Sequence, residues 1–143
     1  MITVTSKDVK RSILVPPAWY PVTVKSVTTK PAKSDGSSNF FFEIEVSDGP
    51  FKDTPCKDFL INEKGLFSTG LAFLVACGFP KEMLDKIKKG EAPDTPVDEN
   101  ACVGKTIKAF VGTTTWENRK SNECLDFLPL DAPTPKMPDA PKK

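Results

Sequence analysis

Histidine is absent from this sequence of 143 residues. Enzymes use histidine more often than any other side chain as a general base, so its absence disfavours most acid–base catalysis. A phosphate-binding glycine loop is missing too, because Gly49, Gly65, Gly70 and Gly78 are not spaced as such a loop requires. These absences predict a protein that is not an enzyme and that binds no cofactor.

A strong charge of one sign is also lacking. The chain has 20 basic and 19 acidic residues, a net charge of +1, so its total charge does not point to a nucleic-acid partner. No apolar run approaches the ~18 residues of a membrane span, and residues 1–13 are too polar for a signal peptide. We therefore expect a cytosolic protein without membrane contact.

Cysteine is scarce, and its four positions are far apart in the sequence: Cys56, Cys77, Cys102 and Cys124. None of them forms the CxxC knuckle that usually pre-organises a zinc site. We expect no metal site, but free thiols in a reducing compartment, with Cys77 buried on a helix.

Three acidic residues keep one enzymatic alternative open. Glu43 and Glu45 alternate along a predicted strand, and Asp58 is expected across the adjoining hairpin. Such a group can imitate the site of a metal-dependent nuclease. Alternating acids on a strand are more often solvated, however, and no motif fixes a lysine beside these three. The nuclease interpretation is therefore the weaker one.

The first half of the chain carries the clearest pattern. Residues 19–29, 39–47 and 54–61 alternate between apolar and polar side chains, with turn-forming segments between them. This pattern predicts three antiparallel strands. Val27 breaks the alternation of the first strand, and one extra residue near Lys25–Ser26 would restore it. We therefore predict a β-bulge and a bend there.

The second predicted strand sorts its side chains onto two faces. The inner face is apolar, whereas the outer face is polar except for one aromatic ring, that of Phe41. A large ring on a wet face, next to a loop that contains lysines, is the best functional clue in the sequence. The inner set is Phe40, Phe42, Ile44 and Val46, and the outer set is Asn39, Phe41, Glu43, Glu45 and Ser47.

Helices are predicted after the third strand. Asn62 is a favourable N-cap, apolar side chains recur at helical spacing up to Cys77, and Gly78 is placed to end the helix. Pro80 can start a second helix, which ends at Gly90.

A hairpin is predicted next. Residues 103–115 and 123–128 read as two strands joined by a turn at 117–121. The side chains expected to face inward are Val103, Ile107, Ala109, Val111, Leu125 and Phe127.

The two ends of the chain look less ordered than its centre. Residues 1–12 read as a loose lead-in, and residues 13–15 as a short edge strand. Residues 129–143 contain five prolines and three lysines, too little apolar surface to offset the entropy of ordering. We predict one domain, residues 1–130, followed by a disordered tail, residues 131–143.

Three strands, a helical insertion and a two-stranded hairpin follow the element order of the OB-fold. The predicted fold class is thus all-β with a helical insertion: a five-stranded Greek-key OB-fold barrel with helices between strands three and four. Ligands of this fold lie across strands two and three, between the loops that join strands one to two and four to five. These loops are residues 30–38 and 117–121, and both contain basic side chains.

The chain resembles the small single-stranded-DNA-binding proteins of the OB-fold type from tailed phages. The likeness covers residues 14–130 and rests on four segments. The resemblance implies binding of phage replication or recombination intermediates in the cytoplasm of the infected bacterial host. Many members end in an acidic tail that recruits partners, whereas this chain ends in Lys142-Lys143. The four segments are P-x-x-Y-x-V-x-V, KSDGSSNFFFEIEVSDGPFKD, LINEKGLFSTGLAFLVACGFP and VGKTIKAFVGTTTWENRKSNECLDFLP.

Binding of single strands requires cations that follow the phosphates and aromatic faces on which bases stack. The candidate platforms are Phe41, Phe110 and Trp116, all of outer parity. Each has a structural alternative, since Phe41 could cover a helix or a dimer interface and Trp116 could cap the barrel. The candidate cations are Lys25, Lys30, Lys33, Lys57, Lys108, Arg119 and Lys120.

The primary hypothesis is a sequence-tolerant single-stranded-DNA-binding protein that acts in phage DNA replication or recombination. Its expected partners are single-stranded DNA, replication or recombination proteins of phage or host, and a second copy of the chain in a dimer. The alternative is an OB-fold protein-interaction module that binds no nucleic acid. The near-neutral charge, with Glu43 and Glu45 on the outer face, favours this alternative.

Overall fold

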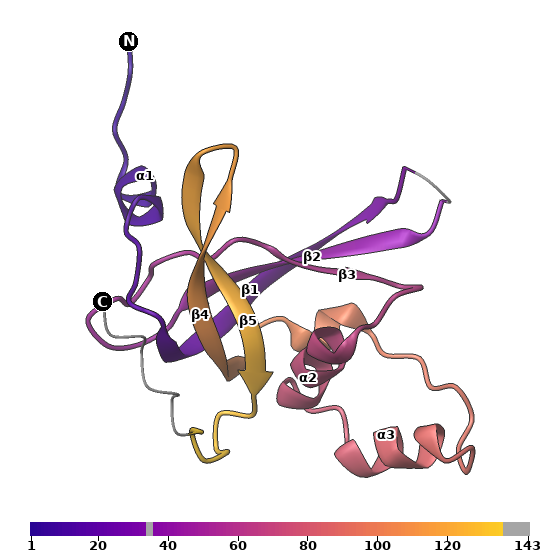
Figure 1. Cartoon of the computed structure of the whole chain (residues 1–143). Coiled ribbons are helices and arrows are strands. Elements are labelled where there is room, and N and C mark those ends of the chain that lie inside the picture. Colours follow the sequence, from indigo (N-terminus) through magenta and orange to yellow (C-terminus); the bar gives the residue numbers. More distant parts are fainter. Residues whose placement is uncertain (34–35, 136–143) are drawn as a thin grey trace.

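The computed structural model describes residues 1–33 and 36–135 and is mostly β-structure (Figure 1). Its strands form one open, antiparallel sheet of five strands in the order β3-β2-β1-β4-β5. The strands are β1 (Ala18–Pro31), β2 (Ser38–Val46), β3 (Phe59–Asn62), β4 (Thr106–Trp116) and β5 (Arg119–Leu128). The helices are α1 (Ser6–Arg11), α2 (Ser68–Ala76), α3 (Lys81–Lys88) and the 3₁₀ helix η1 (Glu99–Cys102).

The long strand β1 bends, as its sequence pattern predicts. Its pairing with β2 shifts register between Val24 and Ser26, so the predicted bulge at Lys25 is confirmed. Before the bulge β1 also pairs with β4, from Ala18 to Thr23. After the bulge β1 continues along β2 alone and forms the long hairpin that extends to the right in Figure 1. The bend thus lets β1 pair with both β2 and β4.

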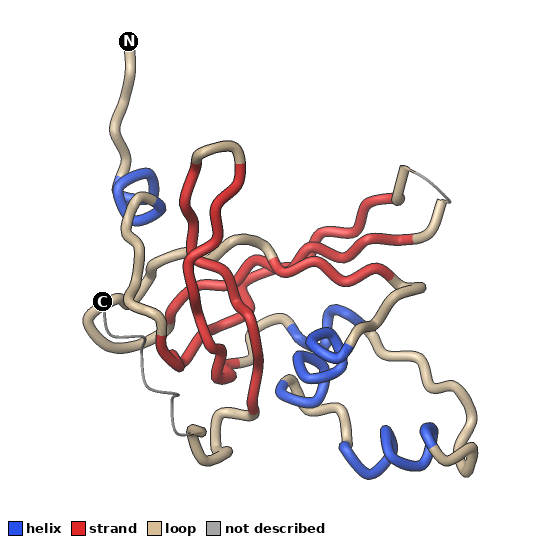
Figure 2. Tube along the Cα trace, viewed as in Figure 1, coloured by secondary structure: helices blue, strands red, loops and turns tan. Residues whose placement is uncertain are grey.

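The core lies on the inner face of the sheet. The apolar parity of β2 is confirmed, because Phe42, Ile44 and Val46 are buried. The ring of Phe73, from α2, lies 4.7 Å from Phe42 and 4.9 Å from Phe127. In Figure 2, α2 and α3 lie below the strands, whereas α1 stands apart near the N-terminus. No helix in residues 1–33 and 36–135 is long and apolar enough to cross a membrane.

The two edges of the sheet, β3 and β5, approach each other. Just before β3, the backbone N–H of Lys57 donates to the carbonyl oxygen of Asn122 in β5, at 2.7 Å. The rings of Phe59 and Phe127 are 4.7 Å apart. The sheet is therefore strongly curled, and these contacts bring Phe59 over the same core as Phe42.

Two predicted boundaries near the third strand are wrong. The strand covers Phe59–Asn62 instead of residues 54–61, and α2 begins at Ser68 instead of after Asn62. Asn62 is not a helix cap, because its side-chain amide donates to Asn39 Oδ1 at 2.7 Å and so holds β3 against β2. The Asn62 side chain thus forms a hydrogen bond between strands and does not cap a helix.

The N-terminus also differs from the prediction. Residues 1–12 are not merely a lead-in, because α1 forms there with a capping box between Thr5 and Asp8. Residues 13–15 add no strand. Instead the N–H of Val15 donates to Asn122 Oδ1 at 3.0 Å, and the Val15 side chain is buried in the core.

The hairpin of β4 and β5 contains a second bulge that the sequence analysis missed. Its register shifts between Phe110 and Val111, so Leu125 does not face inward as predicted but is 48% exposed. Val103 precedes β4 and is exposed as well, whereas the inward orientation of Ile107 and Phe127 is confirmed. The predicted disordered tail lies partly outside the described residues, since residues 136–143 are not among them.

Candidate nucleic-acid interface

The outer face of β2 and β3 carries a small apolar surface. Phe41 pairs with Thr28 of β1 on one side and with Leu60 of β3 on the other. Directly opposed residues share a face of the sheet, so these three side chains lie in one row. Leu60 is 51% exposed, whereas Phe41 is half-buried. Leu60 was not among the residues predicted from the sequence, although its place between the inward-facing Phe59 and Ile61 indicates an outward side chain.

Lys30 adds a positive charge to this surface. It pairs with Asn39 near the end of β1, and its Nζ lies 5.5 Å from the centre of the Phe41 ring. A cation over an aromatic face at this distance is attracted by the ring. Lys33 follows in the adjoining loop and is exposed. Residues 34–35 of the predicted ligand-binding loop lie outside the described residues.

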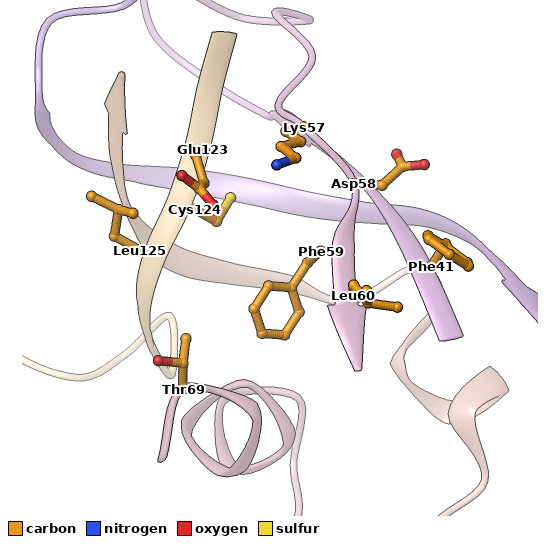
Figure 3. A pocket seen from close by; sticks show the side chains of 9 residues that line it. All are labelled: Phe41, Lys57, Asp58, Phe59, Leu60, Thr69, Glu123, Cys124 and Leu125. Atoms are coloured by element: carbon orange, nitrogen blue, oxygen red, sulfur yellow. The ribbon is translucent and has the colours of Figure 1, made fainter. Parts of the chain in front are cut away.

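A cavity of about 590 Å³ lies between the sheet edges β3 and β5 (Figure 3). In Figure 3, Phe41 and Leu60 lie side by side at one end, and Phe59 projects above Thr69 of α2. The charge of the wall is mixed, because Lys57 is joined by acidic side chains. The lining residues are Phe41, Lys57, Asp58, Phe59, Leu60, Thr69, Glu123, Cys124 and Leu125.

The thiol of Cys124 forms part of this cavity wall. Its hydrogen bond with Cys56 and its burial raise the pKa of the thiol well above its ordinary value. Cys124 therefore contributes a neutral side chain, and the cations and acids around it determine the local charge.

The acids on the outer face of β2 have partners. Ser26 Oγ donates to a carboxylate oxygen of Glu43 at 2.9 Å, and Lys25 Nζ lies 3.6 Å from Glu45. Lys25, a predicted phosphate ligand, is thus positioned to neutralise the negative charge of Glu45. Two lysines of α1, Lys7 and Lys10, line a second cavity with both acids, and the sequence analysis missed this contribution. Thr5 and Asp8 have the spacing of a capping box, from which α1 could have been predicted.

Two further candidates lie on β4. The rings of Phe110 and Trp19 are 5.7 Å apart in an edge-to-face arrangement, across the pairing of β1 with β4. Lys108 Nζ donates to the carbonyl oxygen of Ala132 and, at 3.0 Å, to Thr134 Oγ1. The ammonium group of Lys108 is therefore engaged by the segment that follows β5.

The remaining candidates occupy the tip of the β4–β5 hairpin. Trp116 is 69% exposed, and Arg119 and Lys120 are exposed beside it. Glu117 and Asn118 have φ angles of 47° and 64°, the backbone that two-residue hairpin turns require. This hairpin points upward in Figure 1, away from the direction of the β1–β2 hairpin.

The structure places eight of the ten predicted residues in three groups; of the other two, Lys25 lies beside Glu45 and Lys33 lies in the loop after β1. Phe41, Lys30 and Lys57 meet around the outer face of β2–β3, and we call this the β2–β3 surface, together with Leu60. Phe110 and Lys108 lie on β4, and Trp116, Arg119 and Lys120 lie at the hairpin tip. Within residues 1–33 and 36–135, no group of three or more side chains is arranged to hold a metal ion.

No protein-family model matches the chain, and no curated protein matches it either.

Proposed function

We propose that the protein binds single-stranded DNA without strong sequence preference, with the β2–β3 surface as the centre of the site. The observation that carries the proposal is the row of Phe41 and Leu60, with Lys30 over the Phe41 ring and Lys57 at the adjoining cavity. Aromatic faces with flanking cations are what a single strand requires. A ring left partly in water on this face has no comparable value for folding.

The arrangement supports a division of roles between side chains. A base stacks on Phe41 and contacts Leu60 once the Lys30 side chain moves off the ring. Lys30, Lys33 and Lys57 then attract the phosphates on either side. Stacking of one base on an aromatic side chain contributes about 1–3 kcal/mol. Duplex DNA binds more weakly on this view, because its bases offer no free face to the ring.

The proposed fold for this activity is the OB-type Greek-key barrel. Three observations support it: the bulge in β1, the position of α2 between β3 and β4, and the approach of β5 to β3 at Asn122 and Lys57. In such barrels the outer side of strands two and three is the usual ligand surface. The β2–β3 surface would then occupy the position at which OB-folds bind single strands.

The proposed setting is phage DNA replication or recombination in the cytoplasm of an infected bacterium, with replication or recombination proteins of phage or host as partners. This part rests on the resemblance of residues 14–130 to the phage proteins. A dimer is compatible with the proposal, provided that the β2–β3 surface stays accessible.

Titration of the intrinsic tryptophan fluorescence with oligo-dT tests the activity. The chain has two tryptophans, Trp19 beside Phe110 and the exposed Trp116. Neither belongs to the β2–β3 surface, so the anisotropy of labelled oligo-dT is measured alongside the fluorescence. We expect saturable quenching that weakens as salt is added, and weaker binding of a duplex of equal length. A signal that does not change with oligo-dT, confirmed by absent binding in an anisotropy assay, contradicts the proposal.

One observation favours a second candidate, a protein-interaction module. Asp58 and Glu123 line the cavity beside the exposed side chains of Leu60 and Leu125. Carboxylates repel phosphates, whereas exposed leucines with mixed charge suit a protein partner. If Phe41→Ala leaves DNA binding unchanged and alters the oligomeric state, this candidate replaces the first.

A further inference from the structure

The facing edges of β3 and β5 are unpaired along most of their length. Within residues 1–33 and 36–135, β3 pairs with β2 alone and β5 pairs with β4 alone. In the same part of the chain, a single backbone hydrogen bond joins the two edges, from the N–H of Lys57 to the carbonyl oxygen of Asn122. Beyond it, the cavity of about 590 Å³ lies between β3 and residues 123–125, and we call this cavity the edge groove. The unpaired N–H and C=O groups of such edges can pair with a further strand.

The edge groove also offers apolar side chains to an incoming strand. Leu60 of β3 and Leu125 of β5 are 51% and 48% exposed, and Phe59 lies between the two strands in Figure 3. The sequence of β3, Phe-Leu-Ile-Asn, contains neither a charge nor a proline, the residues that usually protect an exposed edge from pairing. The edge of β3 is therefore open to a strand of suitable sequence.

The first residues of the chain have the sequence of a strand but not its structure. Ile2, Thr3, Val4 and Thr5 alternate between apolar and polar side chains and are all β-branched, as is typical of strands. They belong to no strand, however, and Ile2 and Val4 are 94% and 75% exposed. In Figure 1 this segment extends from α1 away from the sheet. We call residues 1–5 the arm.

The arm and the edge groove complement each other in length and in charge. Five extended residues span roughly 16 Å, and the four residues of β3 span roughly 13 Å. The side chains of the arm are uncharged, and the first charged side chain after it is the exposed Lys7. The groove carries two carboxylates, Asp58 and Glu123, against the one ammonium group of Lys57. This excess of negative charge attracts Lys7 when the arm enters.

We propose that the arm inserts into the edge groove of a second copy of the chain as an added β-strand, and that two copies exchange arms to form a dimer. Pairing of an extended segment with an open sheet edge is a general mode of peptide recognition. Within one copy, the capping box of Thr5 and Asp8 starts α1 and directs the arm away from the sheet. A reciprocal exchange closes with two-fold symmetry. It also doubles the contact, toward the ~1,200 Å² that a stable complex buries.

The edge groove borders Phe41 and Leu60, so the arm and single-stranded DNA compete for this part of the molecule. Self-association is therefore measured without DNA, and its outcome is separate from that of the oligo-dT titration.

Sedimentation equilibrium of the full chain tests the proposal. We expect a monomer–dimer equilibrium with a Kd of about 1–100 µM. The variant Ile2→Asp/Val4→Asp places carboxylates opposite Asp58 and Glu123 and should raise this Kd at least about tenfold. Val97→Asp adds a charge at an exposed apolar residue outside the arm and the edge groove, and as the control it should leave the Kd unchanged. A wild-type chain that stays monomeric at about 1 mM, or an unchanged Kd for the arm variant, overturns the proposal.

A mixing experiment tests whether the arm of one copy meets the groove of another. Leu125→Asp alters the groove from β5, away from the Phe41 ring, and should also abolish self-association. The arm variant and this groove variant should associate when mixed, because an intact arm then meets an intact groove, although neither associates alone. The anisotropy of a labelled groove variant measures this contact. Circular dichroism checks its folding, and Leu125→Ser takes its place if it does not fold. A mixture that stays monomeric overturns the proposal.

A photo-crosslinking amino acid at position 4 of the otherwise unchanged chain identifies the contact directly. We expect irradiation to join two chains, and trypsin then to release residues 1–7 linked to peptide 58–64 or 121–136. Crosslinks within single chains would assign the arm to its own groove, and crosslinks to other peptides would place it elsewhere. Either result overturns the proposal.

Discussion

Phe41 and Phe42 are neighbours in β2, yet they belong to opposite faces with opposite tasks. Phe42 is 2% exposed, and its ring lies 4.7 Å from that of Phe73 in the core. Phe41 faces outward between Thr28 and Leu60, with Lys30 above its ring. The same side chain therefore stabilises the fold at one position and leaves an accessible ring at the next. The pleat of the strand creates this difference, because successive side chains point to opposite faces.

Truncation of the inner ring should have the largest effect of the changes considered. Phe42→Ala removes a buried phenyl group next to Phe73, and such core truncations cost about 3–5 kcal/mol of unfolding free energy. Chemical denaturation followed by circular dichroism measures this loss. Phe41→Ala is the matched control and should cost much less, because the outward ring is only half-buried. Equal losses for the two variants would show that the two faces have been exchanged.

Truncation of the outer ring should instead weaken binding. If one base stacks on Phe41, Phe41→Ala loses about 1–3 kcal/mol of binding free energy, a roughly five- to hundredfold lower affinity for oligo-dT. Fluorescence titration measures the affinity. Phe79→Ala removes a ring from the turn between α2 and α3, outside the β2–β3 surface, and should bind like the wild type. A normal affinity for Phe41→Ala would mean that no nucleobase stacks on Phe41.

The salt dependence of binding tests whether the outer face of β2 contacts phosphates. If about four of the candidate cations meet phosphates, the slope of log affinity against log salt should be near −3 for a single strand. Lys30→Gln removes the cation over Phe41 and should make this slope shallower by about 0.7. Lys86→Gln, on the exposed side of α3, is the control and should leave the slope unchanged. A slope of zero for the wild type would contradict phosphate contacts altogether.

Local pattern was sufficient for β1 and β2. Val27 out of step predicted the bulge between Val24 and Ser26, and the alternation of β2 placed Phe41 outside and Phe42 inside. Both conclusions depend on a period of two along one strand, which neighbouring residues determine. Lys30 lies beside the Phe41 ring because the two residues belong to the paired strands of one hairpin, β1 and β2.

The rest depended on contacts between distant segments. Leu125 was assigned to the core because it alternates with Phe127, but the bulge in the β4–β5 pairing turns it outward, over Gly112 where no Cβ occupies the space. Asn62 looked like a helix cap, yet a bond to Asn39 across the strands was available.

Shortening the C-terminal segment should have the smallest effect. Truncation after Leu130 removes Ala132 and Thr134, the two partners of the Lys108 ammonium group, in a partly exposed position. Hydrogen bonds of this kind contribute about 1 kcal/mol or less near solvent, so the melting temperature should fall by no more than about 2–4 °C. Lys108 lies on β4 and Phe41 on β2, so oligo-dT affinity should stay nearly unchanged. Truncation after Pro135 keeps both partners of Lys108 and is the control. A large loss with the shorter chain alone would assign an anchoring role to the Lys108 contacts. A large loss with both would show that residues 136–143 contribute to stability or binding, against the prediction that the proline-rich tail is dispensable.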